Sequence, residues 1–146
     1  MSNKILNDAD NIREQIAEQL TILFAGTDKD GSQIFKVQRG RYDPLNTLGF
    51  GAVGSGTDPA HSELIYSSYN KSCNREDAML AVTRARESSK DAQGVGSRTD
   101  IYDIGEAVEQ VDHDTVKKYQ RVHAKIEKKK GKVKQSAIEE AFETEG

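Results

Sequence analysis

Two short apolar runs, joined by an acidic turn that ends in glycine, commit residues 20–39 to a β-hairpin. Residues 21–25 are apolar or β-branched, and residues 33–39 return with Phe35 and Val37 on one face. The turn Asp28–Gly31 contains the pair Asp-Gly, which suits the positive φ angles of tight hairpin turns. The hairpin therefore has a sequence signal in both strands and in the turn between them.

Segments with helical spacing lie on both sides of this hairpin. Residues 8–20 carry isoleucine or leucine at every fourth position from residue 12, after aspartates that can cap a helix. Residues 58–69 and 75–90 are predicted to form two further helices, the second capped by Asn74 and lined by small side chains on one face. The side chains that the helix at 58–69 should bury are Ala60, Leu64 and Ile65.

The remaining segments complete an α+β prediction. Residues 40–46 are predicted as a loop, residues 47–53 as a glycine-rich strand and residues 99–104 as a last strand. After Gly105 the chain becomes lysine-rich with helical spacing, which Gly131 is expected to interrupt before one more short helix. We therefore expect an antiparallel sheet with two helices over residues 1–105, and a charged helical extension over residues 106–146.

This order of elements resembles the second half of a proteasome β-type subunit, a member of the N-terminal-nucleophile (Ntn) hydrolase family. The sharpest match is Gly54–Leu64, where a Gly-Ser-Gly turn leads into a helix with alanine and leucine at similar offsets. Phe24–Gly31 is similar to the family's hairpin, Arg75–Ala78 to the start of its next helix, and Thr99–Ile104 to its closing strand. The resemblance covers roughly residues 8–105 and implies half of a four-layer αββα sandwich.

The half that carries the nucleophile in this family has no counterpart in the sequence. Family enzymes use the hydroxyl or thiol of their first mature residue, with its own α-amino group as the base. Ser2 leads into a predicted helix instead of a buried strand, and Gly54–Gly56 follows Thr21 too soon for a first half to fit between them. The resemblance therefore implies a subunit of a threonine-type peptidase assembly that is not catalytic as an isolated chain.

Two helper positions of the family's active site fall on Ser55 and Asp91. The resemblance implies that both lie beside the N-terminal threonine of an assembled enzyme, although Gly94 stands where the family's loop has a serine. Non-catalytic roles are open for both residues. The Ser55 hydroxyl can cap the helix that begins at Asp58, and Asp91 can be a solvated carboxylate or pair with Arg98.

Other patterns give no metal or cofactor site. The three histidines, His61, His113 and His123, lack the spacing of metal ligands and are expected at the surface or against a partner. Asp28 and Asp30 lack the later glutamate of a calcium loop. The lysine run over residues 125–134 is expected to be a solvated helix face, because nearby glutamates offset it.

The composition limits which cellular compartment and which partners we expect for this chain. A net charge of −3 and a pI of about 5.7 do not suggest nucleic acid or an anionic membrane as the main partner. Cys73 is the only cysteine, so an intrachain disulfide is excluded and a reducing, cytoplasmic setting is expected. No stretch approaches the roughly 18 apolar residues of a membrane span, and no signal-peptide core is present.

Three interpretations of the function remain open. In the first, the chain is a proteasome-like peptidase subunit, either a shortened product of its gene or completed by a separate first-half polypeptide. In the second, it is a non-catalytic paralogue that joins or caps a ring. In the third, it is a small binding module with a charged tail. The first two predict homo- or hetero-oligomers with proteasome-like subunits, which would act on unfolded proteins. With 35% hydrophobic residues, the core that the chain can bury alone is modest, so a partner surface is expected in each case.

Overall fold

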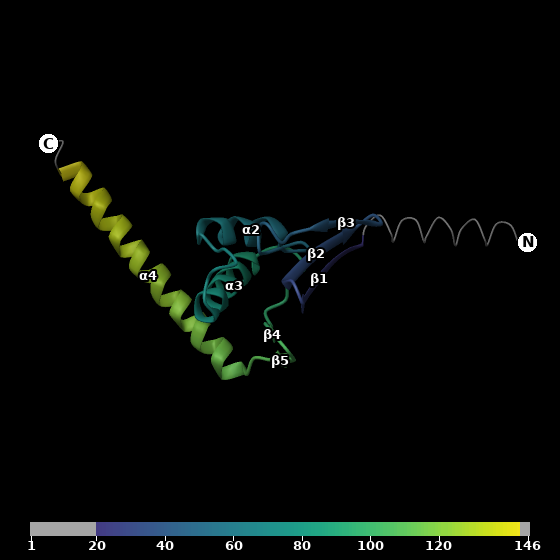
Figure 1. Ribbon diagram of the computed structural model, residues 1–146. Helices are drawn as coiled ribbons and strands as arrows, with labels where there is room; N and C mark the ends of the chain where they lie inside the picture. Colours follow the sequence, from purple (N-terminus) through teal and green to yellow (C-terminus); the bar gives the residue numbers. More distant parts are fainter. Residues whose placement is uncertain (1–19, 144–146) are drawn as a thin grey trace, which may run out of the picture.

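The computed structural model describes residues 20–143, which form an α+β fold of two small antiparallel sheets and three helices (Figure 1). The first sheet has the order β1-β2-β3 and the second pairs β4 with β5. The elements, in chain order, are β1 (Thr21–Asp28), β2 (Gly31–Gln38), β3 (Arg41–Pro44), α2 (Thr57–Tyr66), α3 (Arg75–Ser89), β4 (Tyr102–Ile104), β5 (Val108–Gln110) and α4 (His113–Glu143). The helix expected over residues 8–20 lies, apart from residue 20, outside the described residues.

The predicted hairpin is confirmed, and the chain adds a third strand to it. Phe24 of β1 pairs with Phe35 of β2, and the backbone N–H of Asp30 donates to the Asp28 carboxylate at 2.8 Å within the turn. The loop expected over residues 40–46 is wrong, because a second tight turn lets β3 pair with β2. Arg39 and Gly40 both have positive φ, 54° and 69°, the geometry that matches strand twist in two-residue hairpins.

The glycine-rich strand expected over residues 47–53 is also wrong. After β3 the chain enters a turn in which the N–H of Gly49 donates to the carbonyl of Leu45 at 2.9 Å, and Gly49 has a φ of 76°. The stretch that follows, residues 50–53, is not paired in either sheet. The N–H of Ala52 instead donates to Nε2 of His61 on α2 at 3.2 Å. A side chain therefore takes the hydrogen bond that a strand would have used.

Helix α3 lies between two apolar clusters. On one side, Ala81 and Ala85 pack with Phe50 and with Leu64 of α2. On the other side, Met79 packs with two further buried residues, Ile101 and Val116 of α4. Asn74 caps α3 as predicted, accepting from the N–H of Asp77 at 2.8 Å. Burial of Leu64 is confirmed, whereas Ile65, also expected in the core, is 65% exposed.

Helix α4 continues without a break through Gly131, contrary to the expected interruption. Glycine in a helix interior costs only about 0.5–1 kcal/mol relative to alanine, and the lysines, alanines and glutamates around it favour helix. The first half of α4 packs against α3, whereas residues 127–142 are exposed and extend beyond the other elements (Figure 1). The expected division between residues 105 and 106 stays a prediction; β4 and β5 lie on either side of it.

A substitution at Gly56 can test how closely the start of α2 approaches the end of α3. A Cβ at Gly56 would lie 2.8 Å from Cβ of Ser89, and the φ of Gly56 is an ordinary −90°. Gly56→Ala should therefore lower the free energy of unfolding by about 1–3 kcal/mol through overpacking alone. Gly96→Ala is the control, because an added Cβ there meets no atom within 4 Å. Urea unfolding measures both, and equal losses in the two variants would contradict the close approach.

Candidate functional site

Ser55 lies in the turn that precedes α2 and does not cap that helix. The N-cap position is Gly56, and no side chain accepts a hydrogen bond there. The hydroxyl of Thr57 donates to the carbonyl of Gly54 at 2.6 Å, and the φ of Gly54 is 99°. The capping role considered for Ser55 is therefore wrong, because the helix begins after the turn and leaves the Ser55 side chain exposed.

The turn is tied to the end of α3 by Ser89. Its buried hydroxyl lies 3.1 Å from the carbonyl oxygen of Gly56 and 2.7 Å from that of Ala85, so its one proton is shared between them. Because Gly56 has no side chain, the two backbones can approach closely enough for this contact. The position of Ser55 relative to α3 is therefore set by a buried polar contact, although Ser55 itself is exposed.

Arg86 of α3 holds the loop that faces Ser55. Its Nη2 donates to the carbonyl of Gly96 and lies 3.5 Å from that of Arg98. Its Nη1 is buried and has no hydrogen-bond partner within the described chain. In the same loop Gly94 has a φ of 85°, and a Cβ at Gly94 would lie 3.5 Å from Oγ of Ser55. The structure thus places the Gly94 loop beside Ser55.

Ser55 and this loop line a groove of about 440 Å³, which we call the Ser55 groove. Its polar lining comprises the side chains of Ser55, Arg86 and Ser89, and its apolar lining includes Val82 and Val95. No carboxylate or imidazole lies among the described residues that line it. The groove therefore offers hydrogen-bond donors to a carbonyl or an anion but no general base of its own.

Asp91 is not part of the Ser55 groove. It follows Lys90, the C-cap of α3, and is exposed, as expected for a solvated carboxylate at a helix end. The pairing considered with Arg98 is not formed, because Nε of Arg98 lies 3.2 Å from the Asp100 carboxylate. The structure therefore brings Ser55 and Gly94 together but leaves Asp91 outside their groove.

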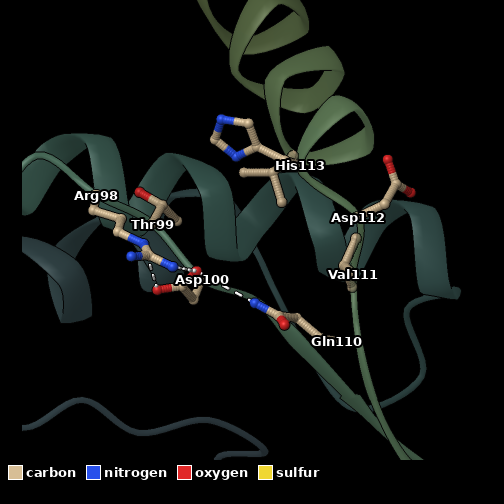
Figure 2. A pocket seen from close by; sticks show the side chains of 8 residues that line it. Arg98, Thr99, Asp100, Gln110, Val111, Asp112 and His113 are labelled. Atoms are coloured by element: carbon tan, nitrogen blue, oxygen red, sulfur yellow. Dashed lines mark hydrogen bonds and ion pairs between the residues drawn. The ribbon is translucent and has the colours of Figure 1, made fainter.

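A second depression, of about 620 Å³, lies where the segment after the Gly94 loop meets the start of α4 (Figure 2). We call it the Arg98 pocket. The Asp100 carboxylate lines it, 3.2 Å from Nε of Arg98 and 3.4 Å from Nε2 of Gln110. His113 and Asp112 extend to opposite sides of the chain at the first turn of α4 (Figure 2). Its residues come from separate segments, so no local sequence motif could have indicated it.

His61 has an internal role that the sequence did not reveal. Besides accepting from Ala52, its ring lies edge-on to Phe50, with centroids 5.6 Å apart. His61 therefore attaches the irregular stretch after β3 to helix α2. His61 is half-buried, and the chain supplies both an N–H donor to Nε2, from Ala52, and an aromatic neighbour for the ring, Phe50.

Within residues 20–143 no three histidine, cysteine, aspartate or glutamate side chains gather closely enough to hold a metal ion. No helix in this range has both the length and the apolar character needed to cross a membrane. Neither the models of known protein families nor the curated proteins give a match to this sequence. The resemblance described above therefore rests on the residues and their order alone.

Asp112, which lines the Arg98 pocket, should make the stability of the chain depend on pH. The hydroxyl and backbone N–H of Thr115 donate to this carboxylate, which holds the pKa of Asp112 below its ordinary value. The stabilisation of the α4 start is therefore complete above the ordinary pKa and is lost as pH falls through the lowered one. Asp112→Asn should lose less stability than the wild type between neutral pH and about pH 3.

Thermal unfolding by circular dichroism at the two pH values measures this difference. Asp114→Asn is the matched control, because it removes an equal charge from the same first turn of α4. Its loss of Tm on acidification should resemble that of the wild type. Identical behaviour of Asp112→Asn and the wild type would contradict the assignment.

Proposed function

We propose that this chain is a proteasome-like subunit of the Ntn-hydrolase type that supplies the second half of the domain to a threonine-type peptidase assembly. The observation that carries this proposal is an apolar sheet face that no element within residues 20–143 covers. Ile22 and Phe24 of β1 share one face with their partners Val37 and Phe35 on β2, and Tyr42 of β3 continues it. Ile22, Phe24 and Tyr42 are 37%, 53% and 71% exposed.

An uncovered face of this composition is unusual for a sheet. Antiparallel sheets that face water on one side usually carry polar side chains there. Here the rings of Phe35 and Tyr42 lie 6.4 Å apart on that face. The other face contacts the chain itself, since side-chain atoms of Leu23 lie close to Gly51. A second sheet from a first-half polypeptide would cover the apolar face and complete the αββα sandwich.

The Ser55 groove supports the same proposal. Ser55 and the Gly94 loop lie together, as the family's helper positions do. In this proposal the assembly is cytoplasmic and degrades unfolded proteins, and the added half provides the threonine nucleophile and its α-amino base.

A non-catalytic, ring-forming paralogue is the second candidate, and the position of Asp91 favours it. A catalytic helper should face the groove that Ser55 lines, but Asp91 is exposed and lies outside it. Under this alternative the sheet face and the helices would still join other subunits. Only the chemistry at Ser55 would be absent.

The uncovered sheet face should drive self-association of the isolated chain. Phe24→Ser/Tyr42→Ser should shift light scattering towards the monomer while leaving Tm nearly unchanged, because both side chains are largely exposed. Ile65→Ser/Tyr66→Ser is the control, since these α2 side chains are 65% and 83% exposed. A wild type that stays a compact monomer at micromolar concentrations, or an equal shift in the control, would count against the proposal.

Catalytic roles can be tested by adding a polypeptide with a threonine-initiated first half. The chain alone should not hydrolyse fluorogenic peptides. In a rebuilt complex, Ser55→Ala and Asp91→Asn should each reduce turnover by about 10²–10⁴-fold, the range of general acid–base assistance. Ser62→Ala, on the exposed side of α2, should not. If the complex forms and turns over normally with both variants, the helper roles are wrong; if it forms without any turnover, the ring-forming alternative gains support.

A further inference from the structure

The charge of this chain is strongly segregated along its sequence. Residues 117–134 contain nine lysines and arginines against one glutamate, a net charge of +8, so the rest of the chain carries −11 of the total of −3. Most of this positive segment lies on the exposed part of α4, beyond its contacts with α3. A segment with this much positive charge attracts surfaces of opposite charge.

One side of α4 gathers these cations around an apolar floor. Lys125, Lys128, Lys129 and Lys132 recur at helical spacing and line a groove of about 390 Å³ together with Val122 and Ile126. We call this the α4 groove. None of the four lysines forms an ion pair in the part of the chain that the structure describes, where α4 has the single pair Lys130–Glu127. Like charges at this spacing repel one another, and no carboxylate within residues 20–143 pairs with these four lysines.

The complementary surface is the hairpin that precedes α4. Residues 100–114 contain six aspartates and glutamates and no lysine or arginine. Asp100 and Asp103 pair with arginines, whereas Glu106 and Glu109 have no ion pair within the described residues. Three large apolar side chains of this β4–β5 hairpin are also exposed: Tyr102 by 55%, Ile104 by 37% and Val108 by 67%.

A single molecule cannot bring these two surfaces together. The hairpin lies at the N-terminal end of α4 and points away from it (Figure 1). Lys125 lies roughly 18 Å along the helix axis from His113, at 1.5 Å per residue. This is about twice the Debye length of roughly 8 Å at physiological ionic strength. Attraction within one molecule is therefore largely screened.

We propose that the α4 groove binds the β4–β5 hairpin of a second copy of this chain. Tyr102, Ile104 and Val108 share one face of the hairpin and would cover Val122 and Ile126. Glu106, in the turn between the strands, would pair with the lysines. Glu109 lies on the opposite face with Asp103 and would add longer-range attraction. A nucleic acid backbone would neutralise the lysines but leave this apolar floor uncovered. Because groove and hairpin are different surfaces, the contact is head-to-tail and produces a closed ring or an open filament. It is independent of the sheet face and of peptidase chemistry.

A charge swap tests this contact in the full chain with the Phe24→Ser/Tyr42→Ser background, which removes association through the sheet face. Lys125→Glu/Lys129→Glu should weaken self-association at least about tenfold in sedimentation velocity, and so should Glu106→Lys/Glu109→Lys. The combined quadruple variant should recover association towards that of the background chain. Raising the salt from about 50 mM to about 500 mM should weaken association of the background chain.

Controls separate the outcomes. Lys29→Glu/Arg41→Glu makes the same net change at exposed positions on the sheet and should not alter association. Circular dichroism confirms that each variant is folded. A quadruple variant no better than either double variant, or association that ignores both reversals, would overturn the proposal. A third outcome would also overturn it. In that outcome the background chain binds a 20-base-pair DNA duplex tightly, Lys125→Glu/Lys129→Glu abolishes this binding, and Glu106→Lys/Glu109→Lys leaves self-association unchanged.

Discussion

The burial of α3 on two opposite sides holds the described part of this chain together. Its small side chains allow α2 to approach on one side, while Met79 joins Ile101 and α4 on the other. One turn after Met79, Thr83 is almost fully buried, and its hydroxyl donates to the carbonyl of Met79 at 2.8 Å. The groove beside Ser55, the Arg98 pocket and the base of α4 all take their positions from this helix.

Local signals in the sequence predicted the elements that depend on neighbouring residues. The Asp28–Gly31 turn and the Asn74 cap act over a few positions, and both are in place. The errors occurred where distant residues decide the structure. Residues 47–53 have the sequence of a strand, but the N–H of Ala52 donates to His61 instead of to a neighbouring strand. Strand β3 depends on a positive φ at Arg39, and arginine has no preference for positive φ. Gly131 failed to end α4 because its neighbours favour helix strongly.

The features of the candidate site also fall into those that the sequence indicated and those that depend on packing between distant residues. The family resemblance implied that Ser55 and Asp91 lie beside one site, but the structure places the Gly94 loop beside Ser55 and leaves Asp91 outside their groove. The unpartnered Nη1 of Arg86 and the Arg98 pocket depend on how α3, the loop after it and α4 pack. No spacing in the sequence encodes that packing. The roles of Ser55 and Asp91 in catalysis stay predictions.

Because α4 is one unbroken helix, its two halves should unfold locally by different routes. Residues 127–142 have no apolar cluster to hold them, so their helical structure depends on local propensity and on a few side-chain pairs such as Lys130–Glu127. Helical segments of this length are marginal alone in water. Amide protons there should exchange with solvent through local fraying, while those of α3 require the two clusters to separate. One continuous helix thus spans two regimes of stability, anchored at its first half and governed by its own sequence in the second.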